Sequence, residues 1–200
     1  MKRIVVVILY FNLMTFIGHA QIINISPSKF NIEDFEKKAQ NTDTYNFQLQ
    51  NGNFVQQGGD KKSGYYERVE EKTSPYGYYK EFFPNGELKT GGPTFYGHKI
   101  GTHKNYNKDG VLIDSINYNK RFTFTIDNLV KEVDSIYHVN LLDKSLRCDV
   151  ALSGDNNPIP SSYYISIPLE AKNTRDIIIS GINGRVIEDR VTTRYIKENE

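Results

Sequence analysis

A segment of this chain that recurs after 24 residues constrains the fold more than any other feature. Gly77–Leu88 reads GYYKEFFPNGEL, and Gly101–Leu112 reads GTHKNYNKDGVL. A period in the twenties is typical of a small supersecondary unit that cannot bury its apolar face alone and must stack on neighbouring units. Five pairs of related chemistry match in register: Gly77 with Gly101, Phe82 with Tyr106, Asn85 with Asp109, Gly86 with Gly110, and Leu88 with Leu112.

Each copy predicts a β-hairpin. Asn-Gly and Asp-Gly tolerate positive φ at both central positions of a two-residue turn, so we expect the strands to pair around Asn85-Gly86 and Asp109-Gly110. Aromatic residues in the flanking runs would supply the apolar face that packs on adjacent hairpins. These are Tyr79, Phe82 and Phe83 in the first copy and Tyr106 in the second.

At these positions the chain resembles the MORN repeat variant family, whose bacterial members contain tandem units of the form G-x-[aromatic]-x-x-[aromatic]-x-x-[ND]-G-x-L, followed by a stretch ending near G-K-x-G. Gly77–Leu88 fits this form, and Tyr96–Gly101 resembles the connector. The second copy departs from it at His103 and in Tyr118–Phe122, which lacks the closing glycine. The resemblance covers about residues 76 to 121 and implies a stack of hairpins with no catalytic residues. It also implies an antitoxin-like role, because many such sequences are catalogued as YwqK-type antitoxins.

A degenerate third unit is one interpretation of the preceding segment. Tyr45 and Asn51–Phe54 echo Tyr79 and Asn85–Leu88 at an offset of 34 residues, and Gly64–Val69 has the composition of a strand. Two complete units are fewer than a free-standing solenoid needs, so the flanking segments are expected to cap the stack.

The first twenty residues have the organisation of a secretory signal peptide. Lys2 and Arg3 precede an apolar stretch, Ile4–Ile17, and Gly18-His19-Ala20 places small residues at the cleavage positions. We expect export with cleavage after Ala20, which makes the mature protein periplasmic or extracellular. The alternative is an N-terminal membrane anchor, for which this stretch, interrupted by Asn12, is short.

Charge and cysteine content exclude several classes of function. The 25 basic and 24 acidic residues leave a formal net charge of +1, which gives no electrostatic footprint for nucleic acid. No polybasic segment is present to hold anionic lipid. The single cysteine, Cys148, excludes an intramolecular disulfide, so stability must come from packing.

Beyond the repeats, the hydrophobic pattern changes period. A cap at Thr125 or Asp127 would begin a helix, and strict alternation marks strands over 146–152 and 163–169. Asn183-Gly184 signals a final hairpin between 175–182 and 185–192. The helix has one apolar face made of Leu129, Val130, Val133, Ile136 and Tyr137.

The predicted fold is mainly β (α+β), a tandem array of MORN-like hairpins followed by a helix and an antiparallel meander. A short helix is also expected over 32–39. The expected parts are a signal peptide (1–20), an N-terminal segment (21–44), the hairpin repeats (45–121), a C-terminal helix plus antiparallel sheet (122–195) and a charged tail (196–200).

The residues that could carry chemistry have simpler structural interpretations. Cys148 alternates with core positions, so we expect a buried, inert thiol that does not act as a nucleophile with His138. His98 and His103, with Asp109 and Asp114 downstream, match no metal-ligand spacing, and His103 takes an aromatic position of the repeat.

Two further groups of residues also fit structural roles. Glu70 and Glu71 are typical of an exposed turn. Gly58-Gly59 and Gly91-Gly92-Pro93 precede no helix, lack the Lys-Ser/Thr of a phosphate loop and are predicted to be bends. We therefore expect no enzymatic activity, cofactor or metal.

Aromatic residues crowd the repeats, and alternation along strands places some of them on the solvent side. One interpretation is that both faces pack. The preferred one is a Tyr-rich surface that binds a protein partner, since tyrosine is enriched in interfaces. Its predicted residues are Tyr78, Tyr79, Phe82, Tyr96 and Tyr106, with Tyr78 expected to point to solvent. The predicted function is an exported, non-catalytic repeat protein, antitoxin- or immunity-like. The alternative is an envelope-associated module that binds glycans or lipid headgroups.

Overall fold

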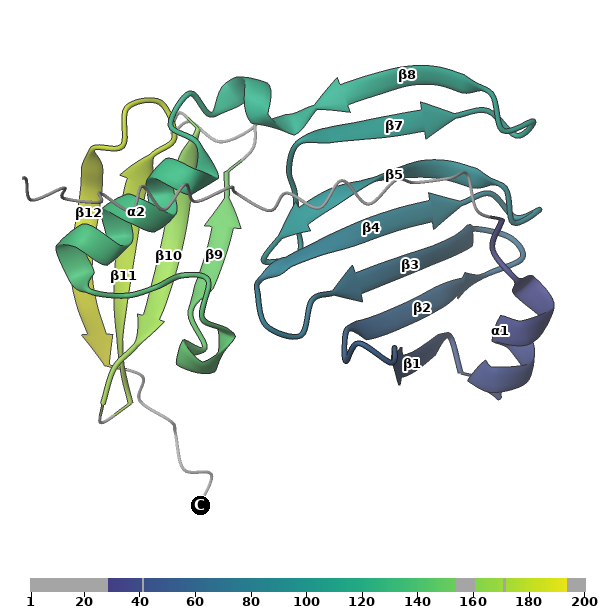
Figure 1. Cartoon of the computed structure of the whole chain (residues 1–200), viewed down its shortest axis with the longest axis horizontal. Helices are drawn as coiled ribbons and strands as arrows, with labels where there is room; N and C mark the ends of the chain where they lie inside the picture. Colours follow the sequence, from purple (N-terminus) through teal and green to yellow (C-terminus); the bar gives the residue numbers. More distant parts are fainter. Residues whose placement is uncertain (1–28, 41, 154–160, 171, 194–200) are drawn as a thin grey trace, which may run out of the picture.

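The protein is mainly β, and the part of the chain that the structure describes contains two antiparallel sheets and two α-helices (Figure 1). The predicted signal peptide, with its cleavage site at Ala20, and the predicted tail from 196 to 200 lie outside the described residues. The computed structural model describes residues 29–40, 42–153, 161–170 and 172–193.

The first sheet is a meander in which successive strands are neighbours, in the order β1-β2-β3-β4-β5-β7-β8, with the short β6 paired to β5. The helix α1 (Ile32–Ala39) lies at the end of this sheet where the β4–β5 and β7–β8 turns also lie (Figure 1). The strands are β1 (Thr44–Gln48), β2 (Phe54–Asp60), β3 (Gly64–Glu70), β4 (Tyr76–Phe82), β5 (Leu88–Phe95), β6 (His98–Lys99), β7 (Thr102–Tyr106) and β8 (Leu112–Asn117).

The second sheet has the order β12-β11-β10-β9, and α2 (Ile126–Tyr137) packs against it. A 3-10 helix, η1 (Tyr118–Arg121), links the first sheet to this part, and a second, η2 (Lys144–Leu146), precedes β9. The strands are β9 (Asp149–Leu152), β10 (Ser162–Pro168), β11 (Asn173–Ser180) and β12 (Val186–Thr193).

The two copies of the repeat form hairpins with the same turn, but it is not the two-residue turn that the sequence predicted. In the first copy, Phe83 N donates to the Glu87 carbonyl at 2.8 Å and Gly86 N donates to the Phe83 carbonyl at 2.8 Å. Gly86 has φ +84°, whereas Asn85 keeps a negative φ. The result is a three-residue loop that ends in a left-handed glycine, which is the next most common way to connect a hairpin.

The second copy repeats this geometry. Asn107 N donates to the Val111 carbonyl at 2.9 Å, and Gly110, with φ +77°, donates to the Asn107 carbonyl at 3.0 Å. The strand register also shifts at equivalent positions. The shift lies between Glu81 and Phe82 in the first copy and between Asn105 and Tyr106 in the second. The sequence period therefore corresponds to a structural period that includes a β-bulge.

The segment that echoes the repeat near Tyr45 forms a hairpin as well. Gly52, with φ +83°, donates to the Leu49 carbonyl at 2.8 Å, which reproduces the turn of the other two copies. Because adjacent strands of the meander are antiparallel, however, the β1–β2 turn lies at the opposite end of the sheet from the β4–β5 turn. This hairpin shares the turn of the repeat but not its orientation.

The glycine-rich segments were predicted to be bends, and this prediction was wrong. Gly58 lies within β2 and Gly92 within β5. A Cβ at Gly58 would come within 3.0 Å of the Tyr66 ring. A Cβ at Gly92 would likewise come within 3.0 Å of the His103 ring. Glycine is required because an aromatic ring from the neighbouring strand lies across each position.

Two hydrophobic clusters hold the fold together. The larger lies between α2 and the second sheet, where Leu129 and Val133 are fully buried, and it includes Phe95 and Ile100 from the first sheet. The smaller lies under α1 and consists of Phe30, Phe35, Ala39, Tyr65, Phe82 and Leu88. One continuous core thus joins the first sheet to the C-terminal part.

The C-terminal part follows the predicted order with two corrections. Thr125 caps α2, since its Oγ1 accepts a hydrogen bond from Asn128 N at 3.3 Å, but Ile136 is 47% exposed and lies off the apolar face. The strand expected from residue 146 begins only at Asp149, because Leu146 belongs to η2. The Asp143 carboxylate stabilises that 3-10 turn by accepting from Ser145 N at 2.9 Å.

Candidate functional site

Three tyrosines and a lysine form the most distinctive surface cluster of the first sheet, here called the tyrosine row: Tyr66, Tyr79, Lys99 and Tyr118. Pairing and alternation place Tyr66, Tyr79 and Lys99 on one face, from β3, β4 and β6. All four side chains are half-buried. Neither described helix lies over them, since α1 is at the sheet's end and α2 packs on the second sheet (Figure 1).

Contacts within the tyrosine row are aromatic and cation–π in character. The Tyr66 and Tyr79 rings stack with centroids 6.4 Å apart and planes at 28°. Lys99 Nζ lies 5.4 Å from the Tyr79 centroid and 6.0 Å from that of Tyr118. Each such contact contributes about 0.5–1 kcal/mol at an exposed site. The lysine therefore bridges two aromatic groups that are distant in sequence.

Charged groups surround Tyr79. Glu81 lies on the same face, 3.9 Å from Lys99 Nζ and 3.6 Å from Lys89 Nζ, and Arg68 is the cross-strand neighbour of Tyr79. Burial, reinforced by the Glu81 carboxylate, raises the pKa of Tyr79 to about 12. Its hydroxyl therefore remains a hydrogen-bond donor at neutral pH.

His103 supports the row from beneath and has a packing role. It is 1% exposed, and its ring meets Tyr118 edge-on at 4.9 Å. Nε2 lies 3.0 Å from the Pro93 carbonyl, and burial lowers the imidazole pKa. A neutral ring that donates from Nε2 satisfies this contact, while Nδ1 has no partner among the described residues. The prediction that His103 replaces an aromatic residue is confirmed.

Of the five residues predicted to bind a partner, only Tyr79 belongs to the tyrosine row. Tyr78 was expected to point to solvent, and this was wrong, because it is 6% exposed with its ring against Gly91 of β5. Phe82 is 3% exposed in the cluster under α1, and Tyr106 packs beside that cluster. The sequence signal for the burial of Tyr78 was the Gly-Gly-Pro run of β5. Interpreted as part of a strand instead of a bend, it predicts space for a neighbouring ring.

Tyr96 lies at the junction of the two sheets. It occupies a two-residue turn with Gly97, where both residues have positive φ (+49° and +77°), so the turn type predicted at Asn-Gly occurs here instead. Its Oη donates to the Leu141 carbonyl at 2.7 Å, and its ring packs on Phe95. Tyr96 therefore connects the two parts of the molecule.

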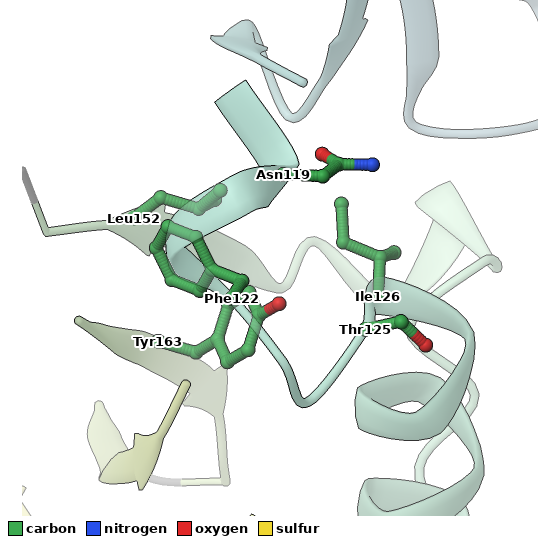
Figure 2. Close-up of a pocket in the computed structure, with 6 residues that line it drawn as sticks. All are labelled: Asn119, Phe122, Thr125, Ile126, Leu152 and Tyr163. Atoms are coloured by element: carbon green, nitrogen blue, oxygen red, sulfur yellow. The ribbon is translucent and has the colours of Figure 1, made fainter. Parts of the chain in front are cut away.

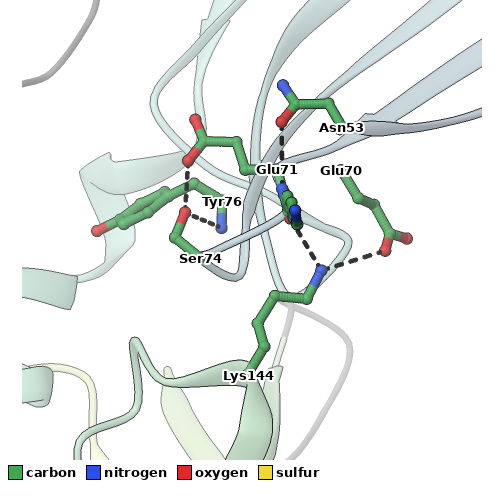
Figure 3. Close-up of polar contacts among 7 residues, drawn as sticks. Asn53, Glu70, Glu71, Ser74, Tyr76 and Lys144 are labelled. Atoms are coloured by element: carbon green, nitrogen blue, oxygen red, sulfur yellow. Dashed lines mark hydrogen bonds and ion pairs between the residues drawn. The ribbon is translucent and has the colours of Figure 1, made fainter. Parts of the chain in front are cut away.

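Glu70 and Glu71 also make contacts at the junction of the two sheets (Figure 3). Lys144 Nζ from η2 donates to the Glu71 carbonyl at 3.0 Å and lies 3.8 Å from the Glu70 carboxylate. The Glu71 carboxylate in turn accepts from Ser74 Oγ. These carboxylates form structural contacts and share no pocket as an acid/base pair would.

Two hollows in the described part of the chain differ in size and lining. The first, beside the start of α2, is lined by Phe122, Ile126, Leu152 and Tyr163 and has a volume of about 20 Å³, room for roughly one water molecule (Figure 2). Its one buried hydroxyl, Tyr163 Oη, already donates to the Phe124 carbonyl at 2.7 Å.

The second hollow is an open groove of about 560 Å³ between α1 and the β2–β3 loop. Phe35 and Tyr65 form its apolar floor, and Glu36 and Lys61 pair across its rim at 3.0 Å. The Asp60 carboxylate accepts from two backbone amides of its own loop, which lowers its pKa. The Glu36, Asp60 and Lys61 side chains are therefore occupied by local contacts.

The remaining sequence candidates do not assemble into a chemical site. Cys148 is buried as predicted, and burial raises the pKa of its thiol. No group of three or more His, Cys, Asp or Glu side chains is placed to hold a metal ion within the described ranges. In the same part of the chain, no helix is both long and apolar enough to cross a membrane.

Comparisons with known proteins leave the chain without an identified relative. No family model, no curated protein and no solved structure matches it.

Proposed function

We propose that this protein is an exported, non-catalytic repeat protein that binds a protein partner through the tyrosine row. The observation that carries the proposal is that Lys99 lies over both Tyr79 and Tyr118 while Tyr66 stacks on Tyr79. Tyrosine presents a large contact area with few rotatable bonds and is enriched where proteins bind one another. The sheet fixes these rings before binding, which lowers the entropic cost of association.

Charge around the row suits a polar partner surface. Lys99, Lys89 and Arg68 supply cationic groups, and Glu81 supplies an anionic one, on the same side of the sheet or at its margin. Such mixed charge favours specificity and orientation over raw affinity. An antitoxin- or immunity-like role is one form of this function, and the MORN-like repeat supports it. The signal-like segment at residues 1–20 would place the partner in the periplasm or outside the cell.

The alternative function is glycan or lipid-headgroup binding in the cell envelope. The near-parallel stacking of Tyr66 and Tyr79, with Arg68 and Glu81 as hydrogen-bonding neighbours, favours it, because sugars also bind on aromatic faces flanked by polar groups. A protein partner is preferred because no residue of the tyrosine row lines either hollow described above, as a glycan groove would require.

Affinity capture from an envelope extract tests the proposal. The bait is the wild-type chain, and the test variant is Tyr79→Ala with Lys99→Ala. The matched control is Tyr45→Ala with Lys104→Ala, which removes a tyrosine and a lysine from the opposite face of the same sheet. A protein retained by the wild type and the control but lost by the test variant supports the proposal.

Retention by the test variant would refute binding through the tyrosine row. A glycan array or vesicles of defined composition, probed with the same three chains, test the alternative. Binding there that depends on Tyr79 and Lys99, without a captured protein, would favour the envelope-associated module.

A further inference from the structure

The last strand of the repeat array, β8, is an edge strand with an apolar surface. Four large apolar side chains in and beside it are well exposed: Val111 (58%), Leu112 (52%), Ile113 (66%) and Ile116 (44%). Edge strands usually carry charges, prolines or a covering element that prevents pairing with other chains. Repeat arrays likewise need terminal units with a polar outer surface.

Comparison of the two repeat copies shows that β8 lacks a covering strand. Leu112 occupies the position that Leu88 occupies one repeat earlier, yet Leu88 is only 2% exposed. The edge of β5, which contains Leu88, is covered by β7 of the next hairpin, whereas no described strand pairs with the outer edge of β8. A leucine that the next strand covers in the first copy therefore recurs in β8, where no described strand covers it.

The opposite edge of the first sheet, formed by β1, exposes polar side chains. The strand β1 exposes Thr44, Asn46 and Gln48, while Tyr45 and Phe47 stack on each other at 5.1 Å. A head-to-tail contact between β8 of one copy and β1 of the next would extend into an open filament, whereas a contact of β8 with itself closes as a two-fold dimer.

Hydrogen bonding along β8 determines how two copies could pair. Tyr118 N donates to the Gly101 carbonyl at 2.8 Å. Because every second residue of a strand faces the same neighbour, Ile116 and Asp114 also direct their backbone groups toward β7. Ser115 and Asn117 therefore direct their backbone groups outward. In an antiparallel pair, outward residues face outward residues. Ser115 opposite Ser115 is then an allowed register, with Asp114 opposite Ile116.

Charge favours this register over its neighbour. A shift that placed Asp114 opposite Asp114 would set two carboxylates against each other, which is destabilising for cross-strand pairs. The chain as a whole carries a net charge of only +1, so two copies do not repel at long range. The register centred on Ser115 therefore avoids facing carboxylates.

We propose that β8 pairs with β8 of a second copy, antiparallel and centred on Ser115, to form a two-fold dimer with a continuous sheet. On forming the dimer, Ser115 N exchanges its contact with the Asp114 carboxylate, at 2.6 Å in the single chain, for the Ser115 carbonyl of the other copy. One short strand per copy buries less than the roughly 1,200 Å² of a standard interface. Interfaces of this size are typically weak, so dimerisation is to be measured at about 10–100 μM protein.

Sedimentation velocity across that concentration range provides the first test. Ile113→Lys introduces an edge lysine, and Ser115→Pro removes an outward N–H that the fold itself does not use in a strand ladder. Each is expected to weaken dimerisation at least tenfold. The matched control is Ile187→Lys, which adds the same charge at an exposed isoleucine (53%) of the other sheet's edge strand, β12, and should leave dimerisation unchanged.

Disulfide trapping tests the register. Ser115→Cys would lie on the two-fold axis with Cα atoms about 5.5 Å apart, a separation at which disulfides form. Lys104→Cys, exposed on β7 one strand inside the edge, is the control, and the native Cys148 is buried. Covalent dimer from Ser115→Cys but not from Lys104→Cys is the expected result.

Three results would overturn the dimer: a wild-type chain that stays monomeric at ten times the stated concentration, a dimer that survives both β8 substitutions, or equal trapping of the two cysteine variants. The residues substituted in these tests, Ile113 and Ser115, lie outside the tyrosine row. Loss of partner capture and loss of dimerisation are therefore separable by variant.

Discussion

Gly92→Ala tests whether aromatic rings lying across strand glycines determine the packing of the first sheet. A Cβ at Gly92 would lie within 3.0 Å of three ring atoms of His103, a side chain that is 1% exposed. The ring must move, and it then loses the contact of Nε2 with the Pro93 carbonyl at 3.0 Å. Overpacking of this kind costs about 1–3 kcal/mol, and the lost hydrogen bond about 0.5–1.5 kcal/mol. We expect a total of about 3 kcal/mol.

Urea unfolding followed by circular dichroism measures this loss, and a double-mutant cycle identifies its cause. His103→Ala removes the ring that the added methyl group would strike, so Gly92→Ala should cost about 1 kcal/mol or less in that background. Gly97→Ala is the comparison, because its Cβ would meet nothing within 4 Å and would only strain a residue with φ +77°. That strain is about 1–2 kcal/mol.

The steric reasoning fails if Gly92→Ala is no more destabilising than Gly97→Ala. It also fails if the effect of Gly92→Ala is the same with and without the His103 ring. Either result would mean that the ring relaxes at little cost and that the glycine is not required for packing.

Three further substitutions or conditions test other contacts. Tyr96→Phe leaves the Leu141 carbonyl unpaired at the junction of the sheets, and we expect a loss of about 1–1.5 kcal/mol in urea unfolding. Thr125→Ala removes the cap of α2 and should cost about 1 kcal/mol, whereas Thr125→Asn should preserve it. Burial lowers the pKa of His103, so the unfolded chain binds the proton more tightly. Stability should therefore fall as pH drops below about 6.5, and His103→Phe should reduce this dependence.

Local sequence predicted the elements of this fold more reliably than the contacts between them. The two hairpins, the Thr125 cap and the burial of Cys148 follow from residues that act within one turn or one strand. The predicted turn type failed because Asn-Gly is compatible with more than one loop length. The bulge beside Phe82 adds a residue that local composition does not reveal.

The candidate site was predicted less well because burial on a β-sheet depends on the neighbouring strand. Alternation correctly placed Tyr78 and Tyr79 on opposite faces, but it could not show which of them a glycine would accommodate. Gly91 lies beside Tyr78 and leaves space for its ring, so Tyr78 is buried. Tyr79 also has a glycine, Gly92, as its cross-strand partner, but the His103 ring fills the space over it. Tyr79 therefore has Tyr66 and Lys99 as ring neighbours and remains half-exposed. The neighbours of a tyrosine across the sheet thus decide whether its side chain is buried or stays accessible.

The same dependence on neighbours explains why repeat position alone does not determine environment. Leu88 and Leu112 are equivalent in the period, follow the same turn and begin equivalent strands, yet one is buried and the other exposed. Leu88 is covered by α1's cluster and by the following hairpin, neither of which exists beyond Leu112 in the described chain. Burying Leu112 would remove about as much apolar surface from water as burying any core leucine, a gain of roughly 1.5–3 kcal/mol per side chain. In the proposed dimer a second copy would supply the neighbouring strand, but not the cluster under α1, so it would recover part of this gain at each of the two symmetric positions.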